Sequence, residues 1–215
     1  MEISNEGGGT ANNVSGVITS IVGSGSITYA SGPAPASQVI NGHNRGYITW
    51  IYNATGEGVV SVSGKATGTD SGLGTGIESA IGGSNVILIE RAASLLGEIA
   101  VSPMQVSEGQ IITVVLSVTN SGEADALSVT PQIGASGTGA VGIASAPTPT
   151  VIGGGASAYF TWTFTAVGSG NVVFTASASG VDENSGAGVT TGTKTSGSVV
   201  IQKPGVLSGS IVAVP

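Results

Sequence analysis

The sequence predicts an all-β protein that contains two tandem copies of one β-sandwich domain. Three observations predict this fold: apolar and polar residues alternate over several segments, turn-forming residues separate these segments, and the two halves of the chain match each other. The composition agrees, because 40% of the 215 residues are hydrophobic, 37 are Gly and only 8% are charged. β-Branched residues in strands and glycines in turns explain these values together, whereas a disordered chain has too few apolar residues to form a core.

The internal repeat is the clearest of these observations. The segment from Tyr47 to Tyr52 matches the segment from Tyr159 to Phe164, and both have Thr-Trp at their centre. Self-similarity at a fixed spacing indicates repeated structural units. Further matches at the same spacing are Val39-Ile40 with Val151-Ile152, Asp70 with Asp182, Ile89 with Ile201, and Leu95 with Leu207. Upstream, Asn5 and Ala11 align with Asn120 and Ala126 at a slightly longer spacing, as expected when loops gain or lose residues.

Within each copy, apolar residues recur at every second position, which is the pattern of a strand with one buried face. In the second copy the inward sets are Ile112/Val114/Leu116/Val118, Phe160/Trp162/Phe164 and Val172/Phe174/Ala176/Ala178. In the first copy they are Met1/Ile3, Ile48/Trp50/Tyr52 and Val60/Val62/Gly64/Ala66. Turn formers such as Asn120-Ser121-Gly122 separate the strands. No segment shows a helical period, so several short strands in each copy predict a β-sandwich.

The segment from Gln110 to Ala126, QIITVVLSVTNSGEADA, resembles the opening of CARDB-type and DUF11-type repeats. These are bacterial and archaeal cell-surface domains in which a hydrophobic alternation is followed by the pattern N-x-G-x-x-x-A. Gly155 with Phe160-Thr161-Trp162 fits the same group. The resemblance implies two tandem immunoglobulin-like β-sandwich domains in a structural or adhesive exoprotein. It brings no catalytic residues, since these repeats share no active site.

The alignment of the two copies predicts the domain boundaries. Residues 1–92 form the first repeat and residues 93–204 the second, and residues 205–215 form a C-terminal strand. Met1 aligns with Leu116, so we expect the first repeat to lack the counterpart of Met104 to Val115 and its leading strand. The segment from Leu207 to Pro215 matches Leu95 to Pro103, the leading strand of the second repeat.

A sandwich that lacks a strand exposes an apolar groove and unpaired backbone groups, and a strand from another chain can fill both. We therefore expect the C-terminal strand, through Ile211, Val212 and Val214, to insert beside Met1 and Ile3 of the next molecule. Such a head-to-tail contact grows a homopolymeric filament if it does not close a ring. The alternatives are an excerpt of a longer repeat array and a self-contained module. An adhesive module that binds a surface glycan or a protein ligand is the other functional reading.

The charge and the apolar pattern exclude several classes of partner. Twelve acidic residues against five basic ones give a net charge of −7, which repels nucleic acid, whose binding needs clustered Lys and Arg. No apolar run reaches the ~20 residues that span a bilayer, so we expect no membrane insertion. The chain has no Cys, which rules out disulfides and thiolate-bound metals. Low charge with Ser- and Thr-rich strands is typical of extracellular and cell-surface proteins.

The sequence does not predict an enzyme. His43 is the only histidine, it lies in a predicted turn, and no serine motif accompanies it. Asp70, Asp182 and Glu183 lie in matching glycine-rich loops and are weak candidates for Ca²⁺, which takes six to eight oxygen ligands. We expect no cofactor, and we interpret these acids as turn residues. Trp50 and Trp162 are expected in the core, because they are in phase with apolar neighbours.

Overall fold

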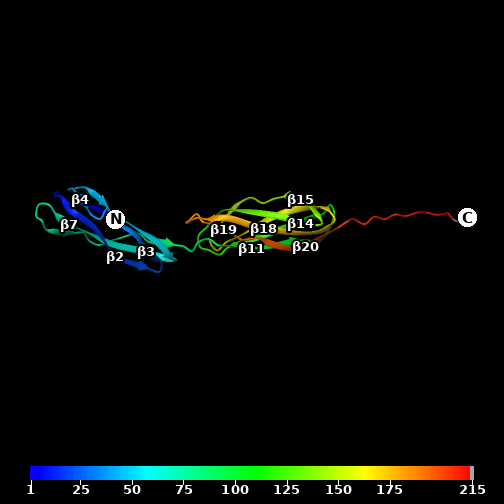
Figure 1. Ribbon diagram of the computed structural model, residues 1–215, viewed down its shortest axis with the longest axis horizontal. Helices are drawn as coiled ribbons and strands as arrows, with labels where there is room; N and C mark the ends of the chain where they lie inside the picture. Colours follow the sequence, from blue (N-terminus) through cyan, green and yellow to red (C-terminus); the bar gives the residue numbers. More distant parts are fainter. Residues whose placement is uncertain (214–215) are drawn as a thin grey trace. The chain divides into compact units, whose positions relative to one another are not determined.

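A computed structural model of the chain describes residues 1–213, and these residues form twenty β-strands and no helix (Figure 1). The chain is therefore all-β. It divides into two compact units, Met1–Arg91 and a second unit from Ala92 onward, which places the boundary one residue before the predicted one. We call them unit 1 and unit 2 and describe each by itself.

Unit 2 contains two sheets. The first has the strand order β11-β13-β17-β15, and all three pairings are antiparallel. The second has the order β12-β20-β18-β14-β16, with β19 beside β18, and only the β12–β20 pair is parallel. The bounds are β11 Leu95–Ser102, β12 Gln105–Ser107, β13 Ile111–Asn120, β14 Ala126–Gly137, β15 Ala140–Ser145, β16 Thr150–Ile152, β17 Ser157–Gly168, β18 Gly170–Asp182, β19 Gly188–Thr190 and β20 Lys194–Gln202.

The predicted alternation places the core of unit 2 between these sheets. Ile112, Val114, Leu116 and Val118 of β13 are fully buried, whereas the residues between them are only partly buried. Side chains of β17 meet those of β18 across the interior, where the rings of Phe164 and Phe174 have centroids 4.8 Å apart. One continuous cluster of buried residues joins both sheets, so the architecture is sandwich-like.

Unit 1 repeats much of this arrangement, and its described residues also form ten strands. Its larger sheet has the order β10-β7-β2-β4, with β8 and β9 also beside β7, and the other strands form the pairs β3–β6 and β1–β5. The bounds are β1 Glu2–Ser4, β2 Ala11–Gly23, β3 Ser26–Ala34, β4 Gln38–Ile40, β5 Arg45–Tyr47, β6 Thr49–Gly56, β7 Gly58–Asp70, β8 Gly76–Glu78, β9 Gly82–Gly83 and β10 Ile87–Ile89. The register of β1 on β5, with Glu2 opposite Tyr47, reproduces that of β13 on β17, with Ser117 opposite Tyr159.

The two units differ in how well they are closed. The buried apolar cluster of unit 1 contains only Ala11, Val14, Ile40 and Ala66, against twenty residues in unit 2. The strands of unit 1 that match β14, β16, β17 and β18 are present, but the described residues provide no counterpart of β11, β12 or the first half of β13. Unit 1 thus has most strands of the sandwich but only a small buried core.

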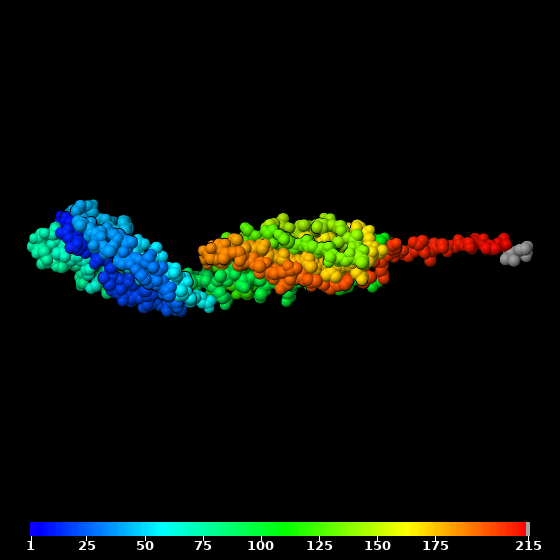
Figure 2. Space-filling view, viewed as in Figure 1, coloured from blue at the N-terminus to red at the C-terminus, as the bar shows by residue number. Residues whose placement is uncertain are grey.

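The C-terminal segment differs from its prediction. Residues 203–213 follow β20 without regular secondary structure and are exposed, and in Figures 1 and 2 this segment (red) projects from the end of unit 2. The predicted C-terminal strand is therefore not formed in the single chain. A strand requires a hydrogen-bonded neighbour, and within the described residues this segment has none.

Candidate functional site

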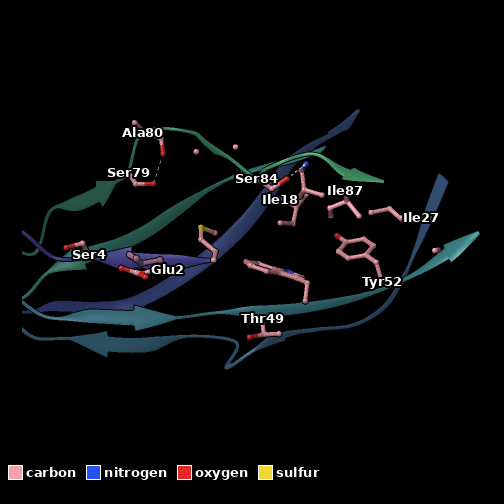
Figure 3. A pocket seen from close by; sticks show the side chains of 18 of the residues that line it. Glu2, Ser4, Ile18, Ile27, Thr49, Tyr52, Ser79, Ala80, Ser84 and Ile87 are labelled. Atoms are coloured by element: carbon pink, nitrogen blue, oxygen red, sulfur yellow. Dashed lines mark hydrogen bonds between the residues drawn. The ribbon is translucent and has the colours of Figure 1, made fainter. Parts of the chain in front are cut away.

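Unit 1 has an open groove of about 790 Å³ where the interior of its sandwich would lie. Its walls come from β1, β2, β3, β6, β7, β9 and β10, and most of its lining is aliphatic or aromatic. Figure 3 shows Ile18, Ile27, Tyr52 and Ile87 gathered at one end of the groove, while Glu2 and Ser4 lie toward the other end. An apolar lining open to solvent is unfavourable for an isolated unit and favours a site where another chain docks.

The lining residues of the groove have counterparts in the closed core of unit 2. Trp50, Tyr52 and Ile87 occupy the positions of Trp162, Phe164 and Val199 in the repeat. Ile87 is 45% exposed, whereas Val199 is 0% exposed. The groove is therefore the counterpart of a core that unit 2 fills with its own residues.

One wall of the groove is the free edge of a strand. In unit 2, β17 lies between β15 and β13, and Ile111 to Val115 of β13 pair with Thr161 to Thr165. In unit 1 the matching strand is β6, and β3 is the only described strand that pairs with it. The opposite edge of β6, beginning at Thr49, thus presents backbone donors and acceptors to whatever enters the groove.

Just before β6, at Ile48, the chain does have a hydrogen-bonded partner on this edge. The amino group of Met1 donates a hydrogen bond to the carbonyl of Ile48 at 2.7 Å, and the Ile48 amide donates to the Met1 carbonyl at 3.0 Å. This is the exchange expected of an antiparallel hydrogen-bonded pair, and Leu116 and Phe160 hold the matching positions in unit 2. The segment from Met1 to Ser4 is thus the second half of a strand whose first half is not supplied by the described residues of unit 1.

Gly16 on β2 permits close packing beside this strand. A Cβ atom at Gly16 would lie 2.4 Å from the Trp50 ring and 2.9 Å from the Cε of Met1. The indole therefore rests directly on the backbone of β2, with its remaining surface turned to the groove. Any residue larger than Gly here would displace the ring.

A smaller cavity of about 140 Å³ lies beside the groove, and Ile3, Ser4 and Ser79 border both. Its other lining residues include Asn5, Ala11, Ile40 and Ala66. In unit 2 the matching place holds the start of β11, where Leu95 pairs with Asn120 and is 5% exposed. The larger opening of unit 1 thus includes the place of β12 and the first half of β13, and the smaller one lies where β11 starts in unit 2.

The polar anchors of β11 show the same contrast. Asn120, fully buried, accepts hydrogen bonds from the amides of Ser94 and Gly122 and donates to the carbonyls of Ala124 and Ile152. Asn5 makes three equivalent bonds, to Gly7, Gly9 and Ile40. The equivalent of the Ser94 bond is absent from the described part of unit 1, because the described residues contain no counterpart of Ser94.

Asp182 holds the start of unit 2 in place. Its carboxylate accepts hydrogen bonds from the Ala93 amide at 2.7 Å and from the amide and hydroxyl of Ser185 at 2.7 and 2.6 Å. The Ser185 hydroxyl bond above all, and then the Ala93 and Ser185 amides, lower the pKa of Asp182, because they stabilise the ionised carboxylate. In unit 1, Asp70 accepts only from the amides of its own loop, Gly72 and Leu73.

Two ion pairs lie on the surface of unit 1, and one of them includes the groove residue Glu2. Arg45 pairs with Glu2 at 2.5 Å and Lys65 with Glu78 at 2.6 Å. The hydrogen bond and positive charge of Lys65 lower the pKa of Glu78. Exposed pairs contribute little to stability. Glu2 is the single carboxylate among the described groove-lining residues, so the groove suits an uncharged, apolar occupant.

The structure brings together some of the residues that the sequence singled out. Met1 and Ile3, the predicted acceptors, both line the groove. Ile211 and Val212, the predicted donors, are exposed in the C-terminal segment, and Val214 lies outside the described residues. The carboxylates of Asp70 and Asp182 accept hydrogen bonds from backbone amides, and Glu183 is exposed. The described residues contain no group of three or more His, Asp or Glu side chains that could hold a metal ion. His43 lies exposed in a turn.

The prediction that both tryptophans are buried is correct for Trp162, which is 3% exposed, and wrong for Trp50. Trp50 is only partly buried, because the strand that would cover it is not among the described residues. The role of Asn120 and Asn5 as anchors was not predicted, although the alignment of the two halves already paired them. No signal in the sequence identifies the buried bond between Asp182 and Ala93.

No protein-family model matches this chain, and no curated protein matches it significantly. Within residues 1–213 there is no helix long and apolar enough to cross a membrane.

Proposed function

We propose that this protein is an extracellular structural subunit that assembles head to tail into a filament or stalk at the cell surface. Its two units are tandem immunoglobulin-like sandwiches of the kind that its resemblance to CARDB-type and DUF11-type repeats implies. The first sandwich is completed by the C-terminal segment of another copy. The observation that carries this proposal is the groove of unit 1, open at the place that unit 2 fills with its own strand.

The groove and the C-terminal segment are complementary in chemistry. The groove offers an unpaired strand edge and an apolar lining. The segment offers Val206, Leu207, Ile211 and Val212, all strongly exposed, and no charged residue beyond Lys203. Adding a strand to an exposed edge satisfies the backbone groups and buries the side chains at the same time. Because donor and acceptor lie on different units of each copy, the contact is heterologous and propagates.

The experiment compares the full chain with a chain in which residues 205–215 are deleted. We expect electron microscopy and size-exclusion chromatography to show filaments or multimers for the full chain and monomers for the deletion variant. The matched control replaces residues 205–215 by a Gly-Ser segment of the same length, which keeps the chain length but removes the apolar side chains. Filaments that persist in both variants would refute donation of this segment.

An adhesive or ligand-binding role is the second candidate. The groove supports an adhesive role as well, because a free strand edge beside an apolar pocket can bind an extended segment of another protein. Monodisperse monomers of the full chain at high concentration would support this candidate over assembly.

A further inference from the structure

We infer that residues 205–213 of a second copy enter the groove of unit 1 in the position that Gln105 to Thr113 hold in unit 2. In this register Val206 and Val212 face the interior, and Leu207 and Ile211 do not. The inference rests on the proposed function and specifies it: the donated segment replaces β12 and the first half of β13, and does not replace the leading strand β11.

The first support is a second match in the sequence, distinct from the match of the same segment to β11. Aligning Val206 with Val106 places Gly209 on Gly109, Ile211 on Ile111 and Val212 on Ile112. Val106 and Ile112 are buried in unit 2, at 3% and 0% exposed, so both inward positions of the donated segment are apolar. Ile111, which aligns with Ile211, is half exposed.

Gly209 falls on a position where the backbone requires glycine. Gly109 has a φ of +87° at the turn between β12 and β13. A residue with a side chain is strained in this region, whereas glycine is not. The aligned segment therefore has the residue that allows it to make the same turn.

The second support is the position of the partners in unit 1. Val106 pairs with Ile201 in parallel, and Ile112 pairs with Phe164 in antiparallel fashion. The counterparts of Ile201 and Phe164 are Ile89 and Tyr52, and both line the groove. A segment in this register would meet Val206 with Ile89 and Val212 with Tyr52.

The third support is continuity with Met1. The donated segment would run antiparallel to β6 and point toward Met1, which already exchanges two hydrogen bonds with Ile48. In unit 2 the same line is a single strand, β13, that runs from Ile111 to Asn120. The tail of one copy and the head of the next would together rebuild this strand from two pieces.

The competing register, with Leu207 on Leu95, leaves the edge of β6 without a partner strand. In that register Leu207, Gly209 and Ile211 face inward, and the segment takes the place of β11. In unit 2, β11 pairs with β13 along its length and does not reach β17. The described counterpart of β13 in unit 1 is only the short β1, so a segment there would pair with β1 and leave the edge of β6 from Thr49 onward unpaired.

Because the two registers place opposite faces of the segment inward, cysteine trapping separates them. The natural chain has no Cys, so only engineered pairs can form disulfides. The inferred register places Ala213 opposite Ile51, since Thr113 lies opposite Thr163 in unit 2. Two pairs lie between this pair and the hydrogen-bonded pair of Met1 and Ile48, so by alternation it is a non-hydrogen-bonded pair with Cα atoms about 4.5 Å apart, within disulfide range. Both side chains are exposed in the single chain.

The matched control for the β11 register is Ser210 with Glu2, because Glu98 lies opposite Ser117 in unit 2. We expect the oxidised A213C/I51C chain to form a ladder of covalent multimers on a non-reducing gel that collapses with reductant. We expect the S210C/E2C chain to remain monomeric under the same conditions. The single-cysteine variants give dimers at most.

Each other outcome overturns the inference. A ladder with S210C/E2C and none with A213C/I51C assigns the segment to the β11 position. Wild-type filaments with no ladder from either pair assign assembly to a different segment. A monomer with an internal disulfide shows that the segment fills the groove of its own copy. If the wild type forms no multimers and neither pair gives a ladder, the proposed function fails together with the inference.

A second pair of variants distinguishes the two registers without engineered cysteines. V212D places a charge in the groove in the inferred register, so the critical concentration for assembly should rise about tenfold or more. I211D places the same charge on the outer face of the segment and should change the critical concentration far less. Both side chains are exposed in the single chain, so neither variant disturbs the fold of unit 2. A larger effect of I211D than of V212D contradicts the inference.

Discussion

The open groove predicts that two aromatic side chains at matching positions contribute very different amounts to stability. Phe164 in unit 2 is 3% exposed and packs against Phe174, whereas Tyr52 in unit 1 lines the groove and is only partly buried. Phe164→Ala removes a buried ring and leaves a cavity, which costs about 3–5 kcal/mol. Tyr52→Ala removes a ring already in contact with water, and we expect a cost of about 1–2 kcal/mol in the unassembled chain.

The two tryptophans make this comparison measurable, because each unit contains one. In a Trp50→Phe background the fluorescence of Trp162 reports the unfolding of unit 2, and in a Trp162→Phe background that of Trp50 reports unit 1. With a urea m value of about 2 kcal/mol/M, Phe164→Ala should lower the midpoint of unit 2 by about 1.5–2.5 M. Tyr52→Ala should lower the midpoint of unit 1 by about 0.5–1 M.

Equal shifts of the two urea midpoints would contradict the difference in burial between Phe164 and Tyr52. Equal large shifts would mean that Tyr52 is as well covered as Phe164, so that unit 1 has a closed core without a donated segment. Equal small shifts would mean that the interior of unit 2 is not packed as the structure shows. The measurement belongs at low protein concentration, since assembly would cover Tyr52 and raise its contribution.

Two further predictions concern the polar anchors of unit 2. Asn120→Ala should destabilise unit 2 by roughly 2–4 kcal/mol in urea unfolding followed by Trp162, because it leaves buried backbone groups unpaired; a cost below about 1 kcal/mol would contradict the hydrogen bonds described above. Asp182 has a folded-state pKa below its unfolded value of about 3.9, so its contribution to stability is present above pH ~4 and is lost as the pH falls through the folded-state pKa. The urea midpoint of unit 2 should therefore fall more steeply below pH 4 in the wild type than in Asp182→Asn, and parallel curves for the two proteins would exclude this role.

Much of the fold follows from local patterns along the chain. The alternation from Ile112 to Val118 predicted which side chains of β13 are buried, because successive residues of a strand point to opposite faces. The match between Asn5 and Asn120 followed from the repeat alone, and both side chains make nearly the same hydrogen bonds. The candidate acceptors Met1 and Ile3 were also identified from this alignment, and both line the groove.

The burial of Trp50 was not predictable in the same way. Trp50 and Trp162 have the same neighbours in sequence and the same phase on their strands, yet only Trp162 is buried. The difference depends on whether a strand from a distant part of a chain covers the ring. The hydrogen bond between Asp182 and Ala93 likewise joins residues that are 89 positions apart, so no local pattern indicates it.

The sequence by itself determined the duplication and, in unit 2, the main strands and their buried faces, since these depend on side-chain periodicity and on the comparison of one half with the other. Only the tertiary structure decided which strand edge is free, where the groove lies and which residues border it. The pairing partners of a strand and the segments that bury its side chains are set by contacts between segments far apart along the chain. Two copies with one local pattern can therefore have a closed core in one unit and an open one in the other.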